Sequence, residues 1–77
     1  MIKELLAEVE RAERLHPEWP EDVIHQVAIM VEEAGEAMRA ALNYVYHGGE
    51  LSELQDELVQ TGAMVIRCLE DIDRRDI

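Results

Sequence analysis

Two long segments with a helical repeat of apolar residues, separated by the pair Gly48-Gly49, limit the folds that this chain can adopt. The first of them starts near residue 21 and carries two adjacent apolar seams, which is typical of a helix that contacts more than one neighbour. The second, from about residue 51 to 73, repeats apolar residues at the same spacing. Because glycine adopts left-handed conformations without steric strain, Gly48-Gly49 predicts the end of the first long helix and a reversal of the chain.

The apolar residues of these segments predict which faces are buried. One seam of the first segment comprises Ile24, Ala28, Val31, Gly35, Met38, Leu42 and Val45. In the second segment, the residues expected to face inward are Leu51, Leu54, Leu58, Val65, Leu69 and Ile72. Counting equal steps outward from the turn places Gly35 opposite Gly62. Glycine inside a helix is unfavourable, so this pair predicts a close approach of the two helix backbones.

A shorter amphipathic segment, from Ile2 to Leu15, precedes the long ones. Pro17 and Pro20 end this first helix, because proline disfavours helical geometry in the residue before it and lacks an amide donor. Each long helix exceeds about 30 Å, so the short helix cannot cover both. We therefore expect one all-α domain over residues 1–77, a short N-terminal helix plus a long antiparallel helical hairpin. A homodimer or homotetramer of such hairpins would have a four-helix-bundle-like core.

The charge of the chain restricts its ligands. Eighteen Asp and Glu stand against seven Lys and Arg, for a formal charge of -11, which argues against direct nucleic-acid binding. A phosphate ligand would need a metal ion between itself and the protein. Cys68 has no partner for a disulfide within the chain, and no apolar run is long enough for a membrane span or a signal peptide. We expect a cytoplasmic protein without a membrane partner.

Acidic residues gather at the same level of both predicted long helices. Glu36 lies three positions after Glu33 and four after Glu32, so the three residues project from one side of a helix. On the second long segment the same spacings link Glu53, Asp56, Glu57 and Gln60. The count from the turn sets Gln60 nearly across from Glu36, with Glu57 about one helical turn nearer the turn. A hard divalent cation with oxygen ligands would relieve the repulsion between these patches, and the alternative is a solvated acidic surface.

Two segments resemble the paired motifs EExxE and ExxD of the all-alpha nucleoside triphosphate pyrophosphohydrolases, the MazG-like superfamily. They are Glu32-Glu33-Ala34-Gly35-Glu36 and Glu57-Leu58-Val59-Gln60. The resemblance extends over about residues 19 to 70. It implies Mg²⁺-dependent cleavage of a nucleoside triphosphate between its alpha and beta phosphates, to a monophosphate and pyrophosphate, with Mn²⁺ as a possible replacement for Mg²⁺.

The resemblance also implies roles for individual residues. Glu33, Glu36 and Glu57 match metal ligands of the family, and Glu32 would ligate a second ion or orient the attacking water. Gln60 stands where the family usually has aspartate, so its amide oxygen would ligate the metal without adding charge. The site would be made by the two long helices and completed by a second subunit.

Further residues have candidate roles at this site. An alternative register of the second motif uses Glu53-Leu54-Gln55-Asp56, a literal ExxD, so that Glu53 or Asp56 would support or replace a ligand. Trp19 would stack on the base or, alternatively, pack over the helix ends. Arg39 and Arg67 would contact phosphates or form salt bridges with nearby glutamates. Two other functions stay open: a catalytically weak homologue that binds nucleotide and Mg²⁺, and a non-enzymatic helical assembly module.

Overall fold

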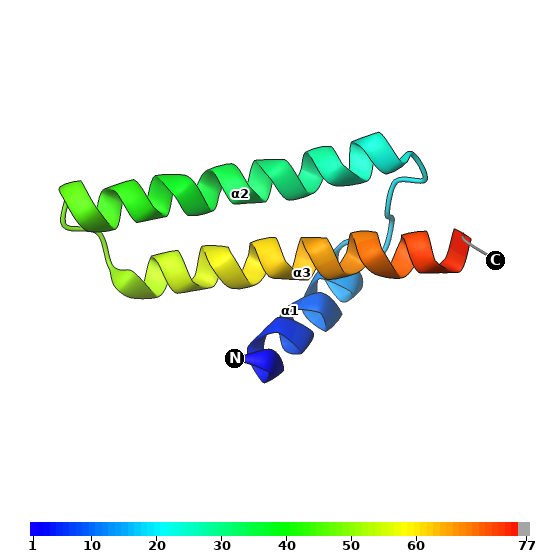
Figure 1. Cartoon of the computed structure of the whole chain (residues 1–77). Helices are drawn as coiled ribbons and strands as arrows, with labels where there is room; N and C mark the ends of the chain where they lie inside the picture. The colour runs from blue at the N-terminus through cyan, green and yellow to red at the C-terminus, as the bar shows by residue number, and fades with distance from the viewer. Residues whose placement is uncertain (76–77) are drawn as a thin grey trace.

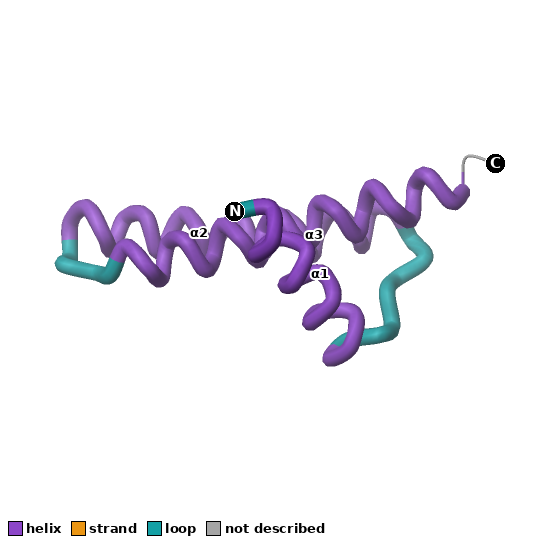
Figure 2. Tube along the Cα trace, turned by 90° about the horizontal axis from the view of Figure 1, so that it is seen from below, coloured by secondary structure: helices purple, strands orange, loops and turns teal. Residues whose placement is uncertain are grey.

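The computed structural model describes residues 1–75, which form three α-helices and no strand (Figure 1). The helices are α1 (Ile2–Leu15), α2 (Val23–Tyr46) and α3 (Leu51–Arg75). α2 and α3 lie side by side and run in opposite directions, and α1 crosses α3 (Figure 1, Figure 2). The predicted all-α class is confirmed for these residues. Residues 76 and 77 of the predicted 1–77 domain lie outside the described part of the chain.

α2 begins at Val23, slightly later than the predicted start near residue 21, and it ends at Tyr46, just before the glycine pair. Asp22 caps its first turn, because the Asp22 Oδ1 accepts a hydrogen bond of 3.0 Å from the backbone N–H of Ile24. At the other end, the N–H of Gly49 donates to the carbonyl oxygen of Asn43 at 2.8 Å. Gly48 has a φ of 71°, in the left-handed region that favours glycine. The glycine pair therefore ends α2 in the way that the sequence predicts.

A small apolar core lies where α1 crosses α3. Its buried members come from α1 and α3: Val9, Ala12, Ala63 and Met64. Partly buried side chains from α2, α3 and the segment after α1 pack against it: Trp19, Ile29, Met30 and Ile66. The core thus joins all three helices near the middle of α3, and it leaves much of the long helices in contact with solvent.

Most of the apolar residues of α3 that were predicted to face inward are exposed. Leu51, Leu58, Val65, Leu69 and Ile72 are between 38% and 55% exposed. The buried positions of α3 are Ala63, Met64, Arg67 and Cys68. The prediction that these residues face the interior of a single chain is wrong. The sides of α3 that contact α1 and α2 carry other residues than this apolar seam. Although apolar residues are exposed, no helix within residues 1–75 has the length and the apolar character that crossing a bilayer requires.

The two helix glycines do not face each other closely. A Cβ atom placed on Gly62 would lie 2.5 Å from Cδ2 of Leu5, whereas one placed on Gly35 would have no neighbour within 4 Å. Gly62 therefore lets α1 approach α3, and Gly35 lies open on α2. The predicted close approach of α2 and α3 at this pair is wrong, because counting from the turn could not take account of α1.

The side-chain amide of Gln26 connects the beginning of α2 with the last part of α3 and with the segment that precedes α2. Gln26 is 0% exposed, and its Nε2 donates to the carbonyl oxygen of Pro20 at 2.7 Å and to Oδ2 of Asp71 at 2.8 Å. The Sγ of Cys68 lies 3.6 Å from the carbonyl oxygen of Gln26. These contacts hold the first part of α2 against the C-terminal part of α3.

Candidate metal-binding site

Three carboxylates from two helices converge between α2 and α3. Glu33 and Glu36 are one turn apart on α2, and Glu57 lies on the adjacent part of α3. One carboxylate oxygen from each residue lies within 4.8 Å of the other two. Glu33 and Glu57 are half-buried, while Glu36 is exposed. We refer to these three residues as the glutamate triad.

The triad holds negative charge that the chain does not compensate with hydrogen bonds. The Oε2 atoms of Glu33 and Glu57 are both buried and have no hydrogen-bond partner within residues 1–75. Burial, followed by the charges of Glu36 and Glu57, raises the pKa of Glu33. Burial raises the pKa of Glu57, and the charge of Glu36 raises that pKa further. Clustered carboxylate oxygens without partners are the donor set that Mg²⁺ or Mn²⁺ accepts.

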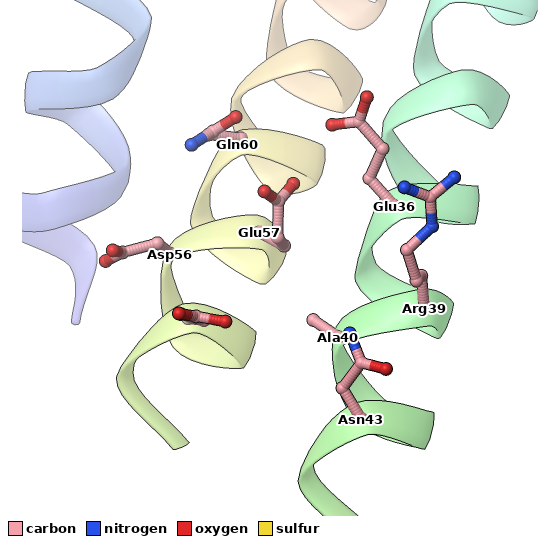
Figure 3. A pocket seen from close by; sticks show the side chains of 8 residues that line it. Glu36, Arg39, Ala40, Asn43, Asp56, Glu57 and Gln60 are labelled. Carbon is pink, nitrogen blue, oxygen red and sulfur yellow. The ribbon is translucent and has the colours of Figure 1, made fainter. Parts of the chain in front are cut away.

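A hollow of about 300 Å³ opens beside Glu36 and Glu57 (Figure 3). We call it the acidic hollow; its lining residues are Glu36, Arg39, Ala40, Asn43, Glu53, Asp56, Glu57 and Gln60. In Figure 3 the carboxylate of Glu36 extends toward α3, and Arg39 lies along α2 next to it. Arg39 is the single cation among these lining residues. The hollow therefore offers a group that could pair with a phosphate oxygen next to the triad.

Of the four polar residues considered for the second motif, only Glu57 belongs to the triad. Glu53, Asp56 and Gln60 line the acidic hollow with Glu57. In Figure 3, however, the Asp56 carboxylate and the Gln60 amide point away from Glu36. Both registers of this motif thus reach the hollow, but Glu57 is the α3 residue that the structure places with Glu33 and Glu36. Glu32 is exposed and lies outside the triad, next to Glu33.

Trp19 and Arg67 lie in a different hollow, of about 250 Å³, with Glu13, Pro17, Glu70 and Arg74. The Arg67 guanidinium stacks over the Trp19 ring, 4.3 Å from the ring centroid. The Arg67 Nη2 also donates to the carbonyl oxygen of His16 at 3.0 Å. One ring face of Trp19 is therefore covered by Arg67, and this stack fastens the segment after α1 to α3. The sequence offered no signal for it, because the partners are far apart in the chain.

The salt bridges considered for the two arginines do not form. Among residues 1–75, no carboxylate lies within 4.0 Å of the Arg39 or Arg67 nitrogens. Arg39 thus stays available at the acidic hollow, while Arg67 is buried by its contacts with Trp19 and His16.

Comparisons with protein-family models, with curated proteins and with solved structures each found no match for this chain. A functional assignment therefore depends on the motif resemblance in the sequence and on the geometry of the glutamate triad.

The raised pKa values of Glu33 and Glu57 predict how the stability of the metal-free protein depends on pH. A carboxyl group with a higher pKa in the folded chain binds its proton more tightly when folded, so it favours folding at low pH. This contribution is lost as the pH rises from the ordinary value of 4.5 through the raised pKa. We therefore expect the free energy of unfolding to fall in this window, as measured by urea denaturation between pH 4 and about pH 8.

A matched variant separates the triad from the other acids. Glu33→Gln should flatten the fall in stability above pH 4.5, whereas Glu10→Gln, an exposed change on α1, should leave it as it is. Asp71 and Glu4 have lowered pKa values, so their effect has the opposite sign and is confined to more acidic solutions. An equally steep fall in Glu33→Gln and in the unaltered protein would contradict the prediction.

Proposed function

We propose that this chain is a Mg²⁺-dependent nucleotide pyrophosphohydrolase, which cleaves a nucleoside triphosphate to a monophosphate and pyrophosphate. The observation that carries the proposal is the convergence of Glu33, Glu36 and Glu57 within 4.8 Å. These residues come from two segments that resemble the EExxE and ExxD motifs of the MazG-like superfamily. A bound cation would also allow a chain with a formal charge of -11 to bind an anionic substrate.

Different residues of the chain would have different roles in this reaction. Glu33, Glu36 and Glu57 would hold Mg²⁺, with the amide oxygen of Gln60 as a further candidate ligand. When bound, the ion would neutralise charge on the phosphates and lower the pKa of a bound water. Glu32 would orient the water whose oxygen bonds to the alpha phosphorus, while the bond from that phosphorus to the oxygen shared with the beta phosphorus breaks. The leaving group is pyrophosphate.

Substrate contacts and assembly complete the proposal. Arg39 would pair with phosphate oxygens at the acidic hollow, which it lines. Trp19 and Arg67 would contact the nucleoside only at the edge of their own hollow, because they already stack on each other. The working form would be a homodimer or homotetramer in which α2 and α3 of each chain contribute to a four-helix core, in the cytoplasm.

Isothermal titration calorimetry with Mg²⁺ and Mn²⁺ tests the metal site. We expect both ions to bind and to raise the melting temperature, because they relieve the repulsion within the triad. Glu33→Gln should weaken this binding by at least about tenfold, whereas Glu10→Gln should not change it. No heat of binding and no change in melting temperature with either ion would reject both the enzyme and a catalytically weak nucleotide-binding homologue, and would leave the helical assembly module.

Gln60→Asp tests whether the missing family aspartate limits the site. The substitution adds a carboxylate to the acidic hollow, so it should tighten Mg²⁺ binding and raise pyrophosphate release. Without metal, the same charge should lower the melting temperature, because it repels Glu36 and Glu57. Melting curves with and without Mg²⁺ measure these opposite signs. A variant that responds alike in both conditions would place residue 60 outside the site and favour the register of Glu53 and Asp56.

A further inference from the structure

The second hollow, of about 250 Å³, is lined by α1, the segment after it and the last part of α3. We call it the arginine hollow; its lining residues are Glu13, Pro17, Trp19, Arg67, Glu70 and Arg74. Its volume is below the ~300 to 1,000 Å³ that is typical of sites for drug-sized ligands. A ligand of this hollow is therefore a molecule of few heavy atoms.

Arg67 brings a buried positive charge to the arginine hollow. Its side chain is 6% exposed, and no carboxylate among residues 1–75 lies within 4.0 Å of its nitrogens. Nη2 donates to the carbonyl oxygen of His16, whereas the other guanidinium nitrogens have no partner in the described chain and are not sealed from solvent. Because a buried charge without a counter-ion is unfavourable, this arrangement favours a ligand with a negatively charged oxygen.

Two carboxylates in the same hollow disfavour a simple anion. Glu13 and Glu70 both line it, and neither forms a salt bridge within the described residues. The whole chain carries a formal charge of -11, so its field also repels small anions. A ligand that carries an ammonium group beside its carboxylate would pair with these glutamates and would have no net charge.

Opposite charges alternate along the side of α3 that lines this hollow. Glu70 lies three positions after Arg67 and four before Arg74, so the three residues project from one side of the helix. Neighbours at these spacings have Cβ atoms about 5 to 6 Å apart. A small molecule with both charged groups on one carbon can therefore reach Arg67 and Glu70 together. We propose that the arginine hollow binds a free amino acid, whose carboxylate pairs with Arg67 and whose ammonium group pairs with Glu70 and Glu13.

This site is separate from the glutamate triad. Arg67 follows Glu57 by ten positions on α3, which corresponds to about 15 Å along the helix axis. An amino acid paired with Arg67 would thus not contact a metal ion held by the triad of the same chain. The inference does not depend on the reaction assigned to the triad, and it adds a ligand of a different chemical class.

An NMR titration with L-alanine tests this site, with propionate and ethylammonium as matched probes that each lack one of the two charged groups. Trp19 is the single tryptophan of the chain, so its indole N–H signal and the side-chain N–H signals of Arg67 report on the hollow. We expect these signals to shift saturably with L-alanine, with a Kd in the millimolar range. Propionate and ethylammonium should each bind at least about fivefold more weakly, because each leaves one set of charged side chains without a partner.

Glu70→Gln supplies a test with opposite signs for two probes. It removes a charged partner of the ammonium group, so L-alanine should bind at least about fivefold more weakly. Propionate should bind more tightly than to the unaltered protein, because the hollow then has an excess of positive charge. Glu10→Gln, an exposed change outside the hollow, should alter neither affinity. Damage to the fold would not tighten the binding of propionate.

The absence of a saturable shift with L-alanine would overturn the proposal. Equal affinities of the unaltered protein for propionate and L-alanine would also overturn it, because they would indicate a simple anion site. Shifts of the Trp19 and Arg67 signals that occur only with Mg²⁺ and a nucleoside triphosphate would assign the hollow to the substrate instead. Mg²⁺ binding should be unchanged in Glu70→Gln, so a failure of this site is distinguishable from a failure of the proposed enzyme.

Discussion

Replacing Glu36 with glutamine is expected to lower Mg²⁺-dependent pyrophosphate release by at least about 100-fold. Glu36 contributes one of the three carboxylates within 4.8 Å, and it lines the acidic hollow. The amide keeps the shape of the side chain but removes a charge that the metal ion needs. Without metal, the same change should raise the melting temperature, because the charge of Glu36 raises the pKa of both Glu33 and Glu57.

The opposite signs distinguish a lost ligand from a damaged fold. Steady-state kinetics should show the loss of activity, and melting curves without Mg²⁺ should show a protein that is at least as stable as the unaltered chain. Glu10→Gln removes the same charge from an exposed position of α1 and should change neither quantity. Full activity in Glu36→Gln would show that the triad does not hold the catalytic ion.

Replacing Arg67 with alanine is expected to lower the free energy of unfolding by roughly 3 to 4 kcal/mol. The side chain is 6% exposed, stacks on Trp19 and donates to the carbonyl oxygen of His16. Truncation removes all three contributions and opens a cavity beside α1. A chain of this length has a total stability of about 4 to 12 kcal/mol, so the loss would be a large fraction of it.

Urea denaturation at a fixed protein concentration measures this effect. Arg74→Ala is the matched control, because Arg74 lines the same hollow but is 71% exposed and lies 3.8 Å from Asp71. Its loss should lower stability by less than about 1 kcal/mol. Similar effects of the two substitutions would contradict the structural role assigned to the stack of Arg67 on Trp19.

The sequence predicted the helices well, because their ends depend on local chemistry. Pro17 and Gly48 act on the residues next to them, and each lies at the end of a helix in the structure. The glutamate triad could be predicted for a similar reason. Helical spacing places Glu33 beside Glu36, and the short turn limits which part of α3 can lie next to them.

Contacts that depend on α1 could not be predicted from the sequence. Gly62 resembled a contact with α2, but it accommodates Leu5 of α1. Arg67 was expected to contact phosphates or nearby glutamates, but it is buried and stacks on Trp19. A periodic pattern shows which face of a helix is apolar, and it does not show whether the same chain or another chain covers that face. For this reason the apolar residues of α3 were assigned to the interior of the chain.

Product analysis with a panel of canonical and modified nucleoside triphosphates tests the central claim most directly. Each substrate is incubated with Mg²⁺ and the protein, and phosphorus NMR identifies the products. We predict a nucleoside monophosphate and pyrophosphate from at least one substrate, with turnover that needs Mg²⁺ or Mn²⁺ and is lost in Glu36→Gln. Release of inorganic phosphate and a nucleoside diphosphate, or no turnover of any substrate, would contradict the assignment of this chain as a nucleotide pyrophosphohydrolase.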